Sequence, residues 1–369
     1  MHKSAIRTGV VGCGAISDIY LTNMIHRFDN LEVVACCAKH LERAQAKARQ
    51  YGIRACTYGE MLEDPTIEMV VILTPAPTHY ELIRAALLRG KHVYTEKTMT
   101  VEPAQAEELL KLADERGLYL GSAPDTFLGA ALQTARQAVD EGRIGRVTSF
   151  LVSVNRDLDY FAGKYEFLRM PGGGICFDYG VYYLTALVSL LGPMQCAAAI
   201  VQNNRPIREN RDFGSPQCGQ TYSYDNESQV SALLQTESGV SGVFSLNGDS
   251  VRRDRAVFLL YGTDGILKLT CPDEFGGDVV LLPNVSAEQP QPAPVTLECK
   301  FDFAQDSRGV GPAEMAAAIL EGRANRASKE MAYHVLDTIQ QIMNSSAQRE
   351  FVEIRSTCAR PAPMVPGAL

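Results

Sequence analysis

The stretch Ile6-Arg-Thr-Gly-Val-Val-Gly-Cys-Gly-Ala-Ile-Ser17 joins an apolar, β-branched run to a glycine-rich turn. Gly12 and Gly14 fit a Gly-x-Gly-x-x-Gly pattern in which serine takes the third glycine position. The first glycine permits a tight strand-to-helix turn, and the second lets a pyrophosphate approach the backbone at the helix N-terminus. Many glycine turns bind nothing, so the pattern alone is a weak signal. It predicts a strand–turn–helix unit that could hold a dinucleotide, with Ala15 and Ile16 in the turn.

Strands and helices alternate regularly downstream of this turn. The expected elements are a helix at 18–28, a strand at 31–37, a helix at 41–51, a strand at 69–73, a helix at 80–89, a strand at 91–95, a helix at 103–116 and a strand at 119–121. Such alternation predicts a parallel, doubly wound α/β sheet of the Rossmann type. We expect residues 1–123 to form an NAD(P)-binding domain that closes at Pro124.

An acidic and a basic residue stand where the strand at 91–95 ends. These residues are Glu96 and Lys97. Ligands of open parallel sheets bind beyond the carboxyl ends of the strands. A lysine placed there can bind a substrate oxygen, or exchange a proton if burial lowers its pKa. An ordinary surface ion pair is the alternative explanation for this dipeptide.

A second loop, Thr74-Pro-Ala-Pro-Thr-His79, follows the strand at 69–73. Its two prolines favour an extended loop over the expected nicotinamide side of the sheet. We therefore count Thr74, Pro75 and His79 among the cofactor-site residues. A single histidine at such a place is more commonly structural than catalytic.

The end of the second strand bears on the choice of cofactor. A site that selects NAD usually has Asp or Glu there, accepting a hydrogen bond from the ribose 2′-hydroxyl. This chain has Ala38 followed by Lys39, and Arg43 lies one helical turn further on. A missing carboxylate and an added cation suit a 2′-phosphate, so NADP is expected and NAD is the alternative. The competing interpretation is that Lys39 simply points into solvent.

Residues 124–369 have a different pattern, in which short alternating strands dominate and Asn247-Gly248 and Asp264-Gly265 mark tight turns. The expected strands are 147–154, 197–201, 229–235, 240–246, 256–261, 266–269 and 279–282, the expected helices are 128–141, 178–191, 313–321 and 329–345, and 289–294 is expected to be a proline-rich exposed loop. This predicts an α+β domain with one large, mostly antiparallel, open sheet for substrate binding and oligomerisation.

Composition excludes several classes of protein. The 369 residues are 46% hydrophobic and 21% charged, with a formal net charge of −8. No basic stripe is present to neutralise phosphates, so a nucleic-acid partner is not expected. No apolar run approaches the roughly 18 residues of a membrane span, and no signal peptide precedes the first strand. The six histidines and ten cysteines show no metal-ligand spacing, so a cytoplasmic protein with reduced thiols and no metal is expected.

A second chemical cluster lies at Gly172–Tyr183, where three consecutive glycines precede an apolar helix. Asp178 and Tyr182 are four residues apart, so on a helix they share one face and can point at the same ligand. The alternative is structural: Asp178 would cap the helix and Tyr182 would pack in the core.

These segments together resemble the Gfo/Idh/MocA family, named for glucose–fructose oxidoreductase, inositol dehydrogenase and a rhizopine-catabolism protein. The resemblance covers nearly the whole chain, and its strength lies in the order and spacing of the motifs. The matching residues are Gly12-Cys13-Gly14, Leu41-Glu42-Arg43-Ala44, Thr74-Pro75 with His79, Gly90-Lys91-His92-Val93, Glu96-Lys97, Gly172-Gly173-Gly174 with Asp178 and Gly180, Gly262-Thr263-Asp264-Gly265, and Arg308-Gly309 before Glu314-Met315.

The resemblance implies NAD(P) as cofactor and a sugar, polyol or related compound as substrate. It places the family's catalytic lysine on Lys97 and its helix aspartate on Asp178. Three departures bear on the substrate and on proton transfer: the usual proline after Glu-Lys is Thr98, the usual arginine after the sixth strand is Asp125, and the usual helix histidine is Tyr182.

Proton transfer therefore has two candidate carriers. Tyr182 has a reference pKa near 10, which a lysine ammonium within about 4–6 Å would lower by about 1–3. A Lys97–Tyr182 pair would then exchange the proton while Asp178 binds a neighbouring hydroxyl. In the competing view Lys97 carries the proton alone and Tyr182 only lines the pocket.

Two further functions remain open besides a dehydrogenase or reductase acting on CH–OH groups. One is a non-catalytic, dinucleotide-binding regulator of the same fold, and the other is an enzyme that recycles a tightly bound cofactor. An open antiparallel sheet with helices on one side leaves an apolar face, so a homodimer or homotetramer is expected.

Overall fold

The computed structural model describes residues 5–250, 256–286, 290 and 292–369. Its contacts divide the chain into two compact units, of which the first is Met1–Leu128 with Gln305–Tyr333 and Gly367–Leu369, and the second is Gly129–Ala304 with His334–Pro366. The expected boundary divided the chain once, after residue 123, whereas 305–333 here belongs to the first unit. Residues 289 and 291 of the expected proline-rich loop lie outside the described residues.

The first unit contains a six-stranded parallel sheet in the order β3-β2-β1-β4-β5-β6. Its strands are β1 (Ile6–Val11), β2 (Leu31–Cys37), β3 (Arg54–Ala55), β4 (Met69–Ile72), β5 (His92–Thr95) and β6 (Leu120–Ser122). The strand order reverses between β1 and β4, the position where dinucleotides bind in doubly wound folds. The predicted Rossmann-type sheet is thus confirmed.

The helices of this unit agree closely with the sequence periodicity, except for the short α3. They are α1 (Ser17–His26), α2 (Leu41–Tyr51), α3 (Tyr58–Glu63), α4 (His79–Leu88), α5 (Pro103–Arg116) and α9 (Val310–Glu321), with single turns η1 (Ala76–Thr78) and η2 (Thr126–Leu128). Helix α5 begins with proline and ends at Gly117 in the left-handed conformation, the usual punctuation of a helix.

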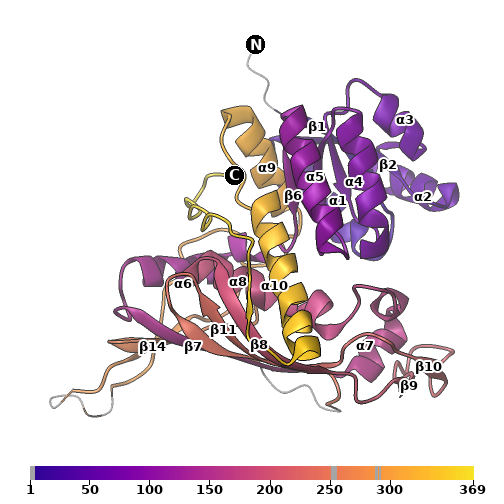
Figure 1. Ribbon diagram of the computed structural model, residues 1–369. Coiled ribbons are helices and arrows are strands. Elements are labelled where there is room, and N and C mark those ends of the chain that lie inside the picture. Colours follow the sequence, from indigo (N-terminus) through magenta and orange to yellow (C-terminus); the bar gives the residue numbers. More distant parts are fainter. Residues whose placement is uncertain (1–4, 251–255, 287–289, 291) are drawn as a thin grey trace. The chain divides into compact units, whose positions relative to one another are not determined.

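Helix α9 comes from late in the sequence and packs beside α1 and the strands β5 and β6 (Figure 1). The carboxylate of Asp125 accepts hydrogen bonds from the amides of Gly309 (3.2 Å) and Gly311 (3.0 Å) and so caps this helix. Asn23 of α1 donates to the carbonyl of Arg308 at 2.8 Å. These bonds tie the returning segment to the first unit.

The second unit is organised around a nine-stranded sheet in the order β16-β15-β14-β13-β7-β12-β11-β8-β17. Its strands are β7 (Val147–Asn155), β8 (Met194–Gln202), β11 (Gln229–Thr236), β12 (Ser241–Asn247), β13 (Val257–Gly262), β14 (Gly265–Lys268), β15 (Val280–Pro283), β16 (Val295–Thr296) and β17 (Val352–Glu353). All neighbours are antiparallel except β7 and β12, which run parallel. The expected large, mostly antiparallel sheet is confirmed.

One face of this sheet is covered by α6 (Ala130–Asp140), α8 (Val181–Leu191) and α10 (Lys329–Gln348) (Figure 1). The opposite face carries apolar side chains on neighbouring strands. Ile200, Leu233, Val243 and Val257 are 64%, 58%, 41% and 39% exposed, and the strand register places them on the same side. The sheet alone therefore leaves an apolar surface uncovered.

Smaller elements at one end of this unit had no clear sequence signal. They are α7 (Leu158–Lys164), the turn η3 (Glu166–Arg169) and a hairpin formed by β9 (Ile207–Glu209) and β10 (Thr221–Ser223). In the part of the chain that is described, no helix is long and apolar enough to span a bilayer.

Candidate functional site

The glycine turn after β1 has the features that a dinucleotide requires. Gly12 has φ +104°, and a Cβ there would lie 2.9 Å from the backbone of Leu73, so no other residue fits without strain. A Cβ on Gly14 would meet nothing within 4 Å. The N-cap residue of α1 is Ile16, which provides no side-chain cap, and the hydroxyl of Ser17 donates to the carbonyl of Gly14 at 2.6 Å. Open space beside a helix N-terminus that has no side-chain cap fits a pyrophosphate.

The end of β2 lies beside this turn, since the amide of Gly12 bonds the carbonyl of Cys37 at 2.9 Å. Ala38 is half-buried, and Lys39 and Arg43 are exposed. The nearby Lys47 is engaged by Asp18. Lys39 and Arg43 are thus the exposed cations nearest in sequence to the expected 2′-position.

The end of β5 is tied to α1 through Glu96. Its carboxylate accepts a hydrogen bond from the Tyr20 hydroxyl at 2.7 Å and one from the amide of Lys97 at 3.1 Å. Burial, together with the charge of Glu96, raises the pKa of Tyr20 well above its usual value. Because Tyr20 stays a neutral donor, Glu96 is held as an acceptor and fixes the backbone that carries Lys97.

The position that the family usually gives to arginine has a structural role in this chain. Asp125 is 1% exposed, and burial raises its pKa to about 6, although the two amides of α9 favour its charged form. Asp125 therefore stabilises the returning helix, and this accounts for an acidic residue at this position.

His79 is fully buried between the loops that follow β4 and β5. Its Nδ1 lies 2.7 Å from the carbonyl of Thr98, and its Nε2 lies 2.7 Å from the carbonyl of Thr74. A neutral imidazole has one N–H, so only the protonated ring can donate to both. Burial lowers the pKa of His79, while both carbonyls oppose that effect. In either form the ring holds the two loops and presents no free nitrogen to a cofactor.

The glycine run of the second unit is explained by close approaches. A Cβ on Gly173 would lie 2.5 Å from the backbone of Leu168, and one on Gly174 would lie 1.9 Å from the carboxylate of Glu227. That carboxylate accepts from the amide of Cys176 at 2.9 Å. Burial raises the pKa of Glu227 to about 7, although backbone amides favour its charged form. Glu227 thus occupies the capping place that the structural alternative assigned to Asp178.

Asp178 lies within a helix irregularity, and Tyr182 lies just after it. The expected helix from 178 begins as a π-type turn, η4 (Cys176–Gly180), and continues as α8. The amide of Val181 bonds the carbonyl of Cys176, five residues back. Turns of this kind are frequent at functional sites. Asp178 and Tyr182 are each 8% exposed.

Arg156, which the sequence did not single out, lies at the end of β7. Its guanidinium stacks between the rings of Phe161 (4.2 Å) and Tyr179 (4.1 Å), and its Nη2 lies 3.5 Å from Oδ2 of Asp178. A charged residue directly after a strand is a common arrangement, so the only available signal was its place at a strand end.

The predicted residues therefore fall into two sets, which are described separately because they belong to different units. The first set, around the carboxyl ends of β1, β2, β4 and β5, contains Gly12, Gly14, Ala15, Ile16, Ala38, Lys39, Arg43, Thr74, Pro75, His79, Glu96 and Lys97. The second contains Asp178 and Tyr182. Within the described ranges, no group of three or more His, Cys, Asp or Glu residues could hold a metal ion.

Two domains of this kind, a dinucleotide-binding sheet and a large open sheet, characterise a class of oxidoreductases. Residues 6–123 match the GFO/IDH/MocA model described as an oxidoreductase family with an NAD-binding Rossmann fold, and residues 132–268 match the GFO/IDH/MocA C-terminal domain. The chain belongs to the Gfo/Idh/MocA family.

Several known proteins are similar to it. An uncharacterized oxidoreductase of Schizosaccharomyces pombe is 30% identical over 206 residues, covering 55% of this chain and 56% of the relative; the match thus spans little more than half of that protein. The dTDP-3,4-didehydro-2,6-dideoxy-alpha-D-glucose 3-reductase of Streptomyces violaceoruber is 31% identical over 280 residues, covering 73% and 78%. The crystal structure of an NAD binding oxidoreductase from Klebsiella pneumoniae has a TM-score of 0.81 at 20% identity, covering 95% and 99%, and shows the same fold.

Proposed function

We propose that the protein is an NAD(P)-dependent dehydrogenase or reductase that moves hydride between the nicotinamide and a carbinol or carbonyl carbon of a sugar, polyol or related compound. The observation that carries this proposal is the open glycine turn of Gly12 and Gly14 at the same sheet edge as Glu96 and Lys97. The Streptomyces relative, named as a sugar-nucleotide reductase, supports the substrate class.

Each candidate residue then has a role. The amides at the start of α1 and the backbone of Gly14 bind the pyrophosphate. Lys97, oriented by Glu96, binds the reacting oxygen, and Tyr182 shares the exchange of its proton. Asp178 accepts a hydrogen bond from a neighbouring hydroxyl. When bound, the nicotinamide cofactor supplies or accepts the hydride.

The experiment is a screen of NADP and NAD reduction against aldoses, inositols and glycosides, followed by two variants. Lys97→Ala should lower kcat/KM by about 10²–10⁴, the usual loss for an acid–base group, and leave cofactor affinity unchanged. Lys111→Ala, at a lysine whose side chain is 78% exposed, is the matched control. Normal turnover by Lys97→Ala would show that the site is elsewhere.

Tyr182→Phe distinguishes the two candidate proton carriers, because it keeps the ring and removes the hydroxyl. A large fall in kcat with a displaced limb of the pH profile supports the shared role. An unchanged profile leaves Lys97 as the sole carrier. A protein that binds the dinucleotide but turns over no compound of the screen would instead be a regulator.

For the cofactor we propose a preference for NADP. A charge-assisted bond from Lys39 to a 2′-phosphate contributes about 1.5–3 kcal/mol, or about 10- to 150-fold in affinity, and Arg43 adds to it. Lys39→Ala should remove most of the difference in Kd between NADPH and NADH, whereas Lys111→Ala should not change it. Equal affinities in the wild type would refute the preference.

For assembly we propose a homodimer or a dimer of dimers built on the uncovered sheet face that carries Ile200, Leu233, Val243 and Val257. Burying such a face is favourable in proportion to its apolar area. We place the protein in the cytoplasm, where reduced thiols are usual; the cysteines in the described part of the chain form no disulfide.

A further inference from the structure

Arg156 is an arginine with little solvent exposure and two aromatic neighbours. Its side chain is 15% exposed and lies between two aromatic rings, one from α7 and one from the π-type turn. Stacking on both faces fixes the plane of the guanidinium, so its N–H groups point in set directions. Its Nε is buried without a hydrogen-bond partner in the described part of the chain. The arginine is thus oriented by rings rather than by a set of hydrogen bonds.

Arg156 and Asp178 form an ion pair whose N–O distance is longer than that of a charge-assisted hydrogen bond. The 3.5 Å between Nη2 and Oδ2 exceeds the about 2.7–2.9 Å of a charge-assisted hydrogen bond. The two groups therefore lie close enough to balance each other's charge, at a separation longer than a short charge-assisted hydrogen bond. A donor and an acceptor stand side by side, both positioned before any ligand arrives.

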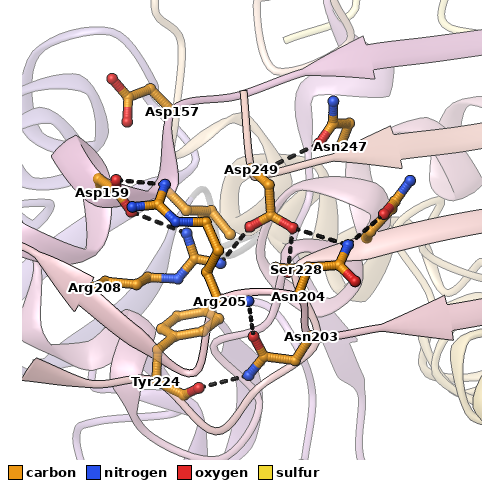
Figure 2. Close-up of polar contacts among 12 residues, drawn as sticks. Asp157, Asp159, Asn203, Asn204, Arg205, Arg208, Tyr224, Ser228, Asn247 and Asp249 are labelled. Atoms are coloured by element: carbon orange, nitrogen blue, oxygen red, sulfur yellow. Dashed lines mark hydrogen bonds and ion pairs between the residues drawn. The ribbon is translucent and has the colours of Figure 1, made fainter. Parts of the chain in front are cut away.

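The helix α7 that carries Phe161 also contributes to an ion cluster around Asp159, Arg208 and Asp249 (Figure 2). Asp159, two residues before Phe161, accepts a hydrogen bond from Nη1 of Arg208 at 3.0 Å, and its Oδ2 lies 2.7 Å from Nη1 of Arg205 in an ion pair. Arg208 is 1% exposed and also pairs with Asp249 at 2.6 Å. The cluster joins α7, the β9–β10 hairpin and the end of β12, and breaking its buried charge pairs would be costly, so it anchors the helix that carries Phe161.

We propose that Arg156 is a specificity-determining residue that acts with Asp178 on two adjacent hydroxyl groups of the substrate. The guanidinium donates to one hydroxyl, and the carboxylate accepts from the next. Because the pair is neutral as a whole, it favours an uncharged vicinal diol over a congener that carries a carboxylate there. This inference rests on the proposed function, since it takes Asp178 to face the substrate.

The test uses Arg156→Gln and Arg156→Lys, with Arg143→Gln as the control at an exposed arginine of the same unit. The probes are the aldohexoses and inositols of the screen, each with a deoxy congener that lacks one hydroxyl. Arg156→Gln should raise KM for the preferred polyol by about 10- to 150-fold. For the deoxy congener that lacks the bound hydroxyl, the same substitution should raise KM much less. The variant should therefore no longer discriminate between the polyol and its deoxy congener. Arg156→Lys keeps the positive charge but loses the planar guanidinium. It should therefore restore part of the discrimination that Arg156→Gln loses.

A purely structural role predicts a different pattern. It would lower Tm and raise KM for the polyols and their deoxy congeners by the same factor. That result would overturn the proposal, and so would an unchanged KM. Phe161→Leu removes one stacking ring and leaves all charges in place. We expect a smaller rise in KM than in Arg156→Gln, again larger for the polyol than for its deoxy congener. A rise of the same size for both compounds counts against the proposal. Binding of NADPH and of NADH, measured on every variant, distinguishes the two proposals. Failure of the wild type to bind either dinucleotide refutes the proposed function, whereas failure of the discrimination pattern refutes only the role of Arg156.

Discussion

Replacing Glu227 by glutamine should change how the stability of the second unit depends on pH. The carboxylate of Glu227 is packed at the start of η4, where Asp178 also repels it, and its pKa is raised from 4.5 to about 7. The two pKa values differ by about 2.5, and each unit corresponds to 1.36 kcal/mol. Ionisation of Glu227 in the folded chain therefore costs up to about 3 kcal/mol.

The sign follows from which state holds the proton. Below pH 4.5 the group is protonated in both the folded and the unfolded chain, and no penalty exists. Between pH 4.5 and 7 the unfolded chain releases its proton first, so the free energy of unfolding falls as pH rises. Above pH 7 the loss is complete and the contribution is flat.

The assay is urea unfolding of the wild type and Glu227→Gln at pH values from 4.5 to 8, followed by far-UV circular dichroism because the chain has no tryptophan. The difference between the two free energies of unfolding should change by up to about 3 kcal/mol across this window in favour of the variant at high pH. The exposed Glu209 provides the control, and Glu209→Gln should show no such window. Asp178→Asn should move the window to lower pH, because it removes a repelling charge. A difference between wild type and Glu227→Gln that does not vary with pH would refute the reasoning.

Three further predictions follow from single contacts. Gly12→Ala should abolish tight dinucleotide binding, measured by fluorescence titration with NADPH, because the new Cβ would meet the backbone of Leu73 at 2.9 Å; retained affinity would contradict the close approach. Asp125→Ala should destabilise the first unit by about 0.5–2 kcal/mol, the usual loss for a helix cap, and speed hydrogen exchange in the first turn of α9; unchanged exchange there would exclude the capping role. Leu233→Glu should convert the proposed dimer into monomers by light scattering at micromolar concentration, since it places a charge on the apolar sheet face; a wild type that is already monomeric would overturn the proposed assembly.

Local patterns were sufficient for most elements of the first unit, although the short β3 and α3 and the returning segment 305–333 were not expected there. Ile6–Val11, Leu31–Cys37, Leu41–Tyr51 and Pro103–Arg116 have the bounds that the sequence periodicity predicts, because each element carries its own apolar face and ends at a glycine, a proline or a turn. Those same signals located the glycine turn and the Glu96–Lys97 strand end, since a parallel sheet brings carboxyl ends to one edge whatever the details of packing. The family and the mostly antiparallel second sheet could likewise be inferred without coordinates.

Long-range contacts decided the rest. Nothing near Asp125 in the sequence indicates that it caps a helix that begins at residue 310, and nothing near Gly174 indicates that its missing side chain makes room for Glu227. Arg156 gained its candidate role from two rings and a carboxylate that come from other elements. A sequence pattern records the preference of a residue for a strand, helix or turn, whereas a cap, a close approach or a stacked cation depends on which distant segment packs against it, and only the tertiary structure supplies that partner.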